Sequence, residues 1–280
     1  MRRGEHGFTL VELIMVIVIL GVIGGMVAVF MRGPIDAYFA SARRAALTDT
    51  ADTAVRRMAR DMHRALPNSM RTPLGNQCIE FMPTKTGGRY RAEGAGALSF
   101  SAAAASFNEL GSNAARSADQ RIAAGDVVVV YNLGIAGASA YANNNTATVS
   151  IDPVEAGAPP ETTVTFAVAT LFPLASGGNR FHVVPGDEQV VSYVCDVAGT
   201  RRLLRTTATI ANAAATSCTT TGALAAGSTR TVLATNVSAC NFDYNTAGLQ
   251  RDALLRMSLQ LTDNGETVSL QHEVHVDNTP

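Results

Sequence analysis

The first pattern along the chain is an apolar run near its beginning. From Phe8 to Met31 about 24 residues are almost wholly apolar, and a helix of that length spans roughly 36 Å, enough to cross a bilayer. One carboxylate, Glu12, interrupts the run. A charged side chain at bilayer depth costs roughly 2.5 to 3.5 kcal/mol, so Glu12 is a candidate functional residue that needs a partner.

A helical pattern continues beyond this run. Apolar residues recur at spacings of three, four and seven until Leu66, and Pro67 ends the pattern. The spacing predicts one long helix from Phe8 to about Leu66, with an amphipathic part over 32–66 whose apolar face a domain must cover. Its weak point is Gly33-Pro34, because the proline removes a helical hydrogen bond. The apolar positions of this part are Ile35, Tyr38, Phe39, Ala42, Ala46, Val55, Met58, Ala59, Met62 and Leu66.

Residues 67–280 have the pattern of a β-rich head. Leu255, Met257, Leu259 and Leu261 alternate with polar residues, which predicts one core face, and the turn at 263–265 predicts a hairpin. The stretches 101–120, 134–150 and 156–161 resemble long loops. The fold class is therefore α+β, a long N-terminal helix packed on a β-rich head. The predicted strands are "QCIEFMP", "GALSFS", "DVVVVYNL", "TVTFAV", "QVVSYVCDV", "RRLLRT", "NVSACNFDY", "ALLRMSLQLT" and "TVSLQHEVHV".

Composition and charge narrow the function classes. The net charge of -1 and the pI near 6.5 argue against nucleic acid as the main partner. Charged residues make up only 16% of the chain, which is typical of an envelope or fibre protein. The arginines between 43 and 64 are expected to form a solvated face, partly matched by Asp49, Asp52 and Asp61.

The residues before the apolar run predict its orientation. Arg2 and Arg3 place that end in the cytoplasm and everything after Arg32 outside. A secretory signal is the alternative, but its cleavage site would follow a shorter apolar core. Here the small residue, Gly7, precedes the run.

Catalytic and metal-binding motifs are missing from the sequence. It has no G-x-S-x-G, P-loop or HExxH motif, so we expect neither an enzyme nor a cofactor. His272 and His275 lie three apart on a predicted strand and point to opposite faces, so they predict no metal site. His272 is in phase with Val274 and Val276 and is expected in the core.

The opening segment resembles the class III signal of type IV pilins and of the pseudopilins of type II secretion. It has the basic leader, Gly7, Phe8 and then "FTLVELIMVIVILGVIGG" with its acid at Glu12. The resemblance implies that residues 1–7 are a leader, that a membrane prepilin peptidase cuts between Gly7 and Phe8, and that it methylates the new amine. The domains are then the leader, a transmembrane helix over 8–31, the amphipathic helix over 32–66 and the head over 67–280.

The same resemblance suggests a partner for Glu12. In a bundle of subunits the carboxylate can lie beside the amino terminus of a neighbour, and an opposite charge nearby favours its ionised form. The pair would set the register between subunits. Gly21 and Gly25 fit G-x-x-x-G, the spacing that lets membrane helices approach closely. In the family this glycine zone and Pro34 mark where the helix loosens in the fibre.

Four distal segments resemble the minor pilins of MSHA (mannose-sensitive haemagglutinin) biogenesis, in particular the MshO family, and more distantly the J class of pseudopilins. They are "RFHVV", "VVSYVCDVAGTRRLLR", "LATNVSACNFDYN" and "GETVSLQHEVHVDNTP". The resemblance implies a subunit held in the inner membrane with a periplasmic head, later part of a surface fibre. Its partners would be the prepilin peptidase, major and minor pilins, the inner-membrane assembly platform and membrane lipid, with no nucleic acid expected. A minor pseudopilin of type II secretion, or an adhesive or DNA-binding module at a pilus tip, are the alternatives.

The cysteines predict two disulfides if the head is exported to an oxidising compartment. Four cysteines allow three pairings, and the sequence does not choose among them. Our preferred pairing is Cys195 with Cys218 and Cys78 with Cys240. The first would close a loop around "RRLLRTT". The second would tie the strand after the long helix to "NVSACNFDY", where Cys240, Phe242 and Tyr244 share a face.

Overall fold

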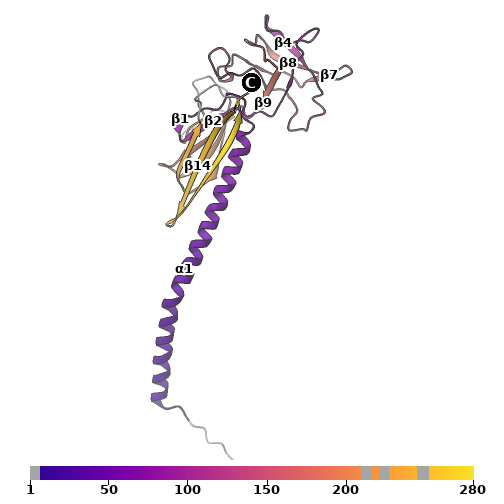
Figure 1. Ribbon diagram of the computed structural model, residues 1–280. Coiled ribbons are helices and arrows are strands. Elements are labelled where there is room, and N and C mark those ends of the chain that lie inside the picture. The colour runs from indigo at the N-terminus through magenta and orange to yellow at the C-terminus, as the bar shows by residue number, and fades with distance from the viewer. Residues whose placement is uncertain (1–6, 210–215, 221–226, 245–251) are drawn as a thin grey trace, which may run out of the picture.

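A computed structural model describes residues 7–209, 216–220, 227–244 and 252–280, so Arg2 and Arg3 of the leader lie outside it. Its dominant element is the helix α1 (Leu10–Met62), 53 residues long, whose first part projects far from a β-rich head (Figure 1). Pro34 lies inside α1 without ending it. The architecture confirms the predicted α+β fold of a long helix joined to a β head.

The helix ends four residues before the predicted Leu66. His63 caps it, with its N–H donating to the carbonyl of Ala59 at 3.0 Å. The N–H of Leu66 instead donates to the carbonyl of Met82, at 2.7 Å. Leu66 is fully buried, so its apolar character serves the head and does not extend the helical face.

The part of the head that packs on α1 contains two antiparallel sheets, and we call it the proximal lobe. Its core joins one face of α1 to the inner faces of both sheets, with Tyr193, Phe81 and Phe242 among the buried side chains. A short strand, β1 (Pro73–Asn76), lies beside β2. The first sheet has the order β12 (Thr229–Ala234), β11 (Arg202–Ala208), β10 (Val190–Asp196), β2 (Cys78–Phe81). The second has the order β13 (Val237–Tyr244), β14 (Asp252–Asp263), β15 (Glu266–Asp277).

The hairpin of β14 and β15 confirms the alternation seen in the sequence. Leu255, Met257, Leu259 and Leu261 are all buried, and Asp263 pairs with Glu266 across the turn. The two turn residues have positive φ, as a tight hairpin turn requires. The prediction for His272 was wrong. The side chain of His272 lies on the same face of β15 as the buried Val274, but it is exposed. Alternation predicts which face of a strand a side chain is on, but not how much of that face the helix covers.

A second lobe is inserted between β2 and β10, two strands that pair directly with each other. We call residues 84–188 the distal lobe, and it lies beyond the C-terminal end of α1 (Figure 1). Its separate core is centred on Phe107, whose ring lies 5.1 Å from that of Phe181. One sheet has the order β3 (Thr86–Arg89), β9 (Arg180–Val184), β5 (Val127–Val130), β6 (Thr146–Thr148). The other has the order β4 (Ala104–Glu109), β8 (Glu161–Thr170), β7 (Val154–Ala156), and a short helix η1 (Ala140–Ala142) lies between β5 and β6.

The distal lobe differs most from the sequence prediction. The segment 96–101 is not a strand, and the expected loop 101–120 contains β4, while 134–150 contains η1 and β6. Strands β3 and β9 were not predicted. Alanine and glycine are frequent in 96–120, in 134–150 and in β3 and give weak periodicity, and β9 is only five residues long, so strand pairing with distant partners decides their conformation.

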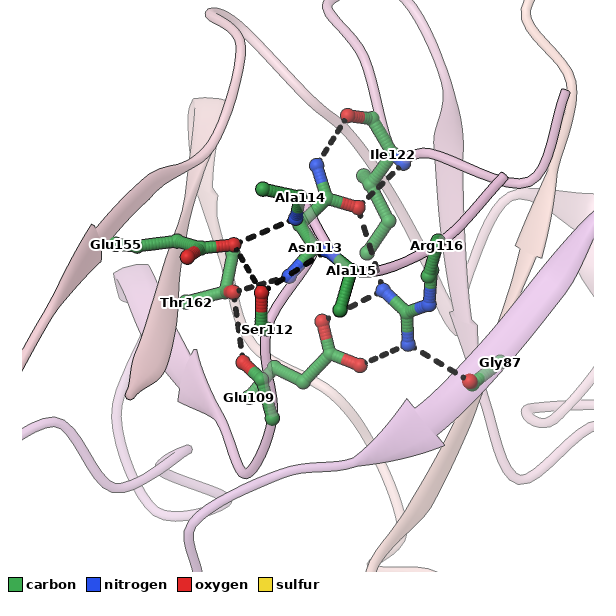
Figure 2. A network of polar contacts seen from close by, with 11 residues as sticks. Gly87, Glu109, Ser112, Asn113, Ala114, Ala115, Arg116, Ile122, Glu155 and Thr162 are labelled. Carbon is green, nitrogen blue, oxygen red and sulfur yellow. Dashed lines mark hydrogen bonds and ion pairs between the residues drawn. The ribbon is translucent and has the colours of Figure 1, made fainter. Parts of the chain in front are cut away.

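The turn-rich loop after β4 is fixed by side chains instead of secondary structure (Figure 2). Asn113 bonds both the N–H and the carbonyl of Ile122, at 2.8 and 2.9 Å. The carboxylate of Glu155 accepts from the N–H of Ala114 and from the hydroxyl of Ser112, and these hydrogen bonds lower its pKa. Arg116 forms an ion pair with the buried Glu109. These bonds satisfy the backbone of a segment that has no ladder.

Two disulfides form, but with a different pairing from the preferred one. Cys78 is bonded to Cys218 and Cys195 to Cys240, with Cα–Cα distances of 6.0 and 6.3 Å. Cys78 lies opposite Val194, and both pack with Cys218 on one face of their sheet. Cys195 is the next residue and faces α1, where Cys240 packs. Cys195 and Cys218 are therefore on opposite faces and cannot bond.

We predict that non-reducing peptide mapping of the exported protein yields a Cys78–Cys218 and a Cys195–Cys240 peptide. Replacing Cys195 and Cys240 together with serine opens a loop with a sequence separation of 45 residues. The chain-entropy model then gives a loss of about 4 kcal/mol in the free energy of unfolding, measurable by urea titration. A Cys195–Cys218 peptide in the native protein would contradict the fold of the first sheet.

Candidate assembly helix

The helix begins with a cap that satisfies its first turn. Thr9 is extended and its hydroxyl accepts from the N–H of Glu12, at 3.3 Å. Thr-x-x-Glu is the spacing of a capping box, a sequence signal that marks the start of the helix at Thr9 and was not part of the prediction. Glu12 is exposed in the first turn, where the positive end of the helix dipole favours a carboxylate.

The first thirty residues of α1 carry an apolar surface that the head does not cover. The most apolar window has a mean hydropathy of 3.0 and none of it is buried. Exposed fractions include 86% for Phe8 and 84% for Phe30. This helix is long and apolar enough to cross a membrane.

The glycines of this segment face open space. A Cβ built on Gly21 or Gly25 would meet no atom within 4 Å outside the helix. The two lie four residues apart on one helix face, so the G-x-x-x-G spacing offers a smooth surface without a partner inside the chain. Around Pro34 the helix is continuous in the isolated chain. A looser helix in a fibre remains an expectation.

The last part of α1 is buried against the head. The covered face starts at Leu47 and not at Ile35. The side chain of Ile35 is 46% exposed, and Tyr38 and Phe39 are more exposed still. The predicted amphipathic face is thus covered only over its C-terminal half. Its buried residues are Leu47, Ala51, Ala54, Val55, Met58, Ala59 and Met62.

A polar network holds this part of the helix in place. Asp61 accepts from the hydroxyl of Tyr193 at 2.6 Å and from Nε of Arg205 at 2.8 Å. Arg205 also pairs with Glu188, at 2.5 Å. Burial and the neighbouring Asp61 carboxylate raise the pKa of Tyr193, so the phenol stays protonated and donates. Burial alone would lower the pKa of Arg205, but its hydrogen bonds with Glu188 and Asp61 raise it overall.

Asp61 was expected to match the arginines of its own helix, and that expectation was wrong. It turns inward to β10 and β11, while Arg56, Arg57 and Arg60 of the same helix are exposed. Arg44 reaches Glu266 at the β14–β15 turn, at 2.8 Å, and Arg56 pairs with Asp52, at 2.7 Å. Both arginine side chains are mostly exposed, so the predicted solvated face is confirmed for them.

The opening segment matches a known family model. A model described as the prokaryotic N-terminal methylation motif matches residues 2–28. The chain carries a type IV pilin-like class III signal. No curated protein and no solved structure matches the chain. The motif and the exposed apolar helix together support a prepilin-type structural subunit anchored in a membrane and processed by a prepilin peptidase.

The predicted site residues fall into two groups in space. Gly7, Phe8, Glu12, Gly21, Gly25 and Pro34 all lie on or before the projecting part of α1, far from the head (Figure 1). The four cysteines lie in the proximal lobe. Among the residues with described positions, no group of three or more His, Cys, Asp and Glu side chains could hold a metal ion.

We predict that Arg205→Leu lowers the free energy of unfolding by about 2 to 4 kcal/mol, because Asp61 and Glu188 would then face each other without a cation. Arg56→Leu is the matched control. It breaks an exposed pair four residues apart on the helix and should cost about 0.5 kcal/mol or less. Urea unfolding of both variants measures the difference, and equal losses would contradict an anchoring role for Arg205.

Proposed function

We propose that this chain is a minor pilin, a structural and assembly subunit of an MSHA-like type IV pilus. The observation that carries the proposal is the methylation motif at residues 2–28 on a helix whose apolar surface has no cover in its own chain. The four distal segments quoted above, which resemble MSHA-type minor pilins, support the finer assignment. The head would be periplasmic before assembly and exposed on the fibre afterwards.

The mechanism is association. The apolar part of α1 holds the subunit in the inner membrane, and the assembly platform then moves it into the fibre, where neighbouring helices replace lipid. Close approach at Gly21 and Gly25 increases the van der Waals contact that drives helix association in lipid. The Glu12 carboxylate pairs with the amino terminus of a neighbour and sets the axial register.

Processing gives the first test of this proposal. Gly7 is exposed and has no side chain to obstruct the peptidase, so Gly7→Val should leave an unprocessed precursor. Mass spectrometry of the parent protein should find N-methylated Phe8 as its first residue. The control Gly33→Val alters a glycine in the same chain outside the signal and should be processed normally. A mature chain of normal size from Gly7→Val would rule out the class III assignment.

Incorporation into fibres gives the second test. Glu12→Val should stay in the membrane, because removing an acid makes the segment more apolar, but its content in sheared fibres should fall about tenfold or more. Asp36→Val is the matched control, since it removes a carboxylate from α1 outside the apolar run. Equal incorporation of Glu12→Val and parent would contradict the pairing.

A chemical cross-link can detect the pair itself. The chain has one lysine, Lys85, whose ammonium lies 2.6 Å from Asp126 and is mostly buried. After processing, the terminal amine is thus its only other amine. A carbodiimide should join the Glu12 carboxylate to the amino-terminal peptide of a neighbouring subunit in intact fibres, and this linked peptide should be missing from dispersed subunits.

A minor pseudopilin of type II secretion remains the second candidate, since the methylation motif serves both assemblies. Deleting the gene should remove the fibre-associated chain without reducing exoprotein secretion if the pilus assignment is correct. Lost secretion with normal pili would favour the pseudopilus.

A further inference from the structure

One face of the distal lobe gathers basic side chains at the sheet edge formed by β3. In the pairing of β3 with β9, Gly87 lies opposite His182 and Arg89 opposite Arg180. Residues two apart on a strand share a face, so Arg89, Arg180 and His182 project from the same side of the sheet. The other side carries Phe181 and Val183, which belong to the lobe's core.

The two arginines form a like-charged pair without compensation. Residues directly opposite in an antiparallel ladder have Cβ atoms about 5 Å apart, and like charges there are destabilising. In the described parts of the chain no carboxylate lies within ion-pair distance of Arg89 or Arg180. Other arginines of this lobe have such partners, since Arg91 pairs with Glu161 and Arg116 with Glu109.

His182 adds a second unsatisfied group at the same place. Its Nε2 is buried and has no hydrogen-bond partner among the residues whose positions are described. Burial and the charge of Arg180 lower the pKa of His182, whereas the charge of Asp277 opposes that effect. A buried nitrogen without a partner carries an energetic cost, so the ring of His182 is a sensitive reporter of changes beside the arginines.

These side chains line a hollow in the surface of about 330 Å³. Its wall also includes Leu110 and the two glycines of β3. The strand is fixed from behind by the network of Figure 2, in which Arg116 donates to the carbonyl of Gly87 at 3.1 Å. The carboxylate of Glu109 occupies the space that a side chain on Gly88 would need. The hollow therefore has a rigid floor.

We propose that this hollow binds a tetrahedral oxyanion, a phosphate or sulfate group, between Arg89 and Arg180. Two guanidinium groups on adjacent strands present paired N–H donors, the geometry that matches two oxygens of one anion. The anion cancels the repulsion between the arginines, and it would lie beside the ring of His182, which lines the hollow. The group can come as the free ion or as a substituent of a larger ligand, such as a sulfated sugar.

The test uses the full chain in a non-ionic detergent. Inorganic sulfate and phosphate are titrated at constant ionic strength set with chloride, and binding is followed by calorimetry and by the ring signal of His182 in NMR spectra. We expect saturable binding by both ions and a shift of the His182 signal. A sulfated disaccharide, compared with its unsulfated form, shows whether the group is better recognised on a sugar.

Variants locate the site. Arg89→Gln and Arg180→Gln should each weaken anion binding about tenfold or more, the loss expected for one charge-assisted hydrogen-bonded contact. Arg57→Gln is the matched control, because it removes the same charge from an exposed arginine of α1 and should leave affinity unchanged. In chloride alone, Arg180→Gln should melt at the same temperature as the parent or higher. Sulfate stabilises folded proteins in general by exclusion from their surface, so the expected result is a larger rise in melting temperature for the parent than for Arg180→Gln.

Three results would overturn the proposal. The first is no binding beyond the chloride reference. The second is an equal loss in Arg57→Gln, which would indicate general charge screening. The third is a parent that binds no anion while Arg89→Gln is lost from fibres, which would assign the arginine pair to a contact with an acidic neighbouring subunit.

Discussion

The structure depends on one constraint, the apolar surface that α1 exposes before it reaches the head. Between Phe8 and Phe39 twenty-one large apolar side chains are exposed in the isolated chain. Burial of each contributes roughly 1.5 to 3 kcal/mol, so the whole surface represents on the order of 30 to 60 kcal/mol. A folded domain is typically stable by only about 5 to 15 kcal/mol. This apolar surface must therefore be covered by lipid or by other subunits, and the core of the head is built from the C-terminal part of α1 alone.

The head packs only on the C-terminal part of the helix, and hydrogen bonds connect the distal lobe and the C-terminal segment to the end of that helix. Asn68, just after α1, bonds the carbonyl of Asn132 in the distal lobe at 2.9 Å and the C-terminal segment through Asn278. The side-chain amide of Asn132 in turn donates to the carbonyl of Pro67, at 2.7 Å. Amides bonded in this way fix geometry, because a lost partner leaves a polar group without its hydrogen bond in a largely desolvated place. The helix end, the distal lobe and the C-terminal segment thus share one joint.

The sequence was most informative where a single physical requirement acts on consecutive residues. Membrane length and the position of Glu12 could be read directly, and so could the alternation of Leu255 to Leu261, because one side of that strand is buried along its length. The disulfide pairing could not be predicted from the sequence. Cys78 and Cys195 lie on different faces of one sheet, and only the register of β2 against β10 shows this. Several strands of the distal lobe could not be predicted for a related reason. Its β-branched strands β5 and β8 could be predicted, but β3, β4, β6 and β7 are short and have little alternation, and β3 is defined by a partner about a hundred residues away, as when Thr86 pairs with Val183.

The two lobes contact the helix to different extents. Every buried residue of α1 belongs to the core of the proximal lobe, so changes in that core affect how the head holds the helix. The distal lobe has its own core and joins the chain through the paired strands β2 and β10, with the ion pair of Lys85 and Asp126 at its base. A like-charged pair directly opposite in its sheet costs roughly 0.2 to 1 kcal/mol, which a separate core can tolerate. The arginine pair is not part of the core that anchors α1, so its repulsion acts first on the distal lobe. The buried contact of Leu66 with Val129 and Val184 is where a change in this lobe would reach the end of the helix.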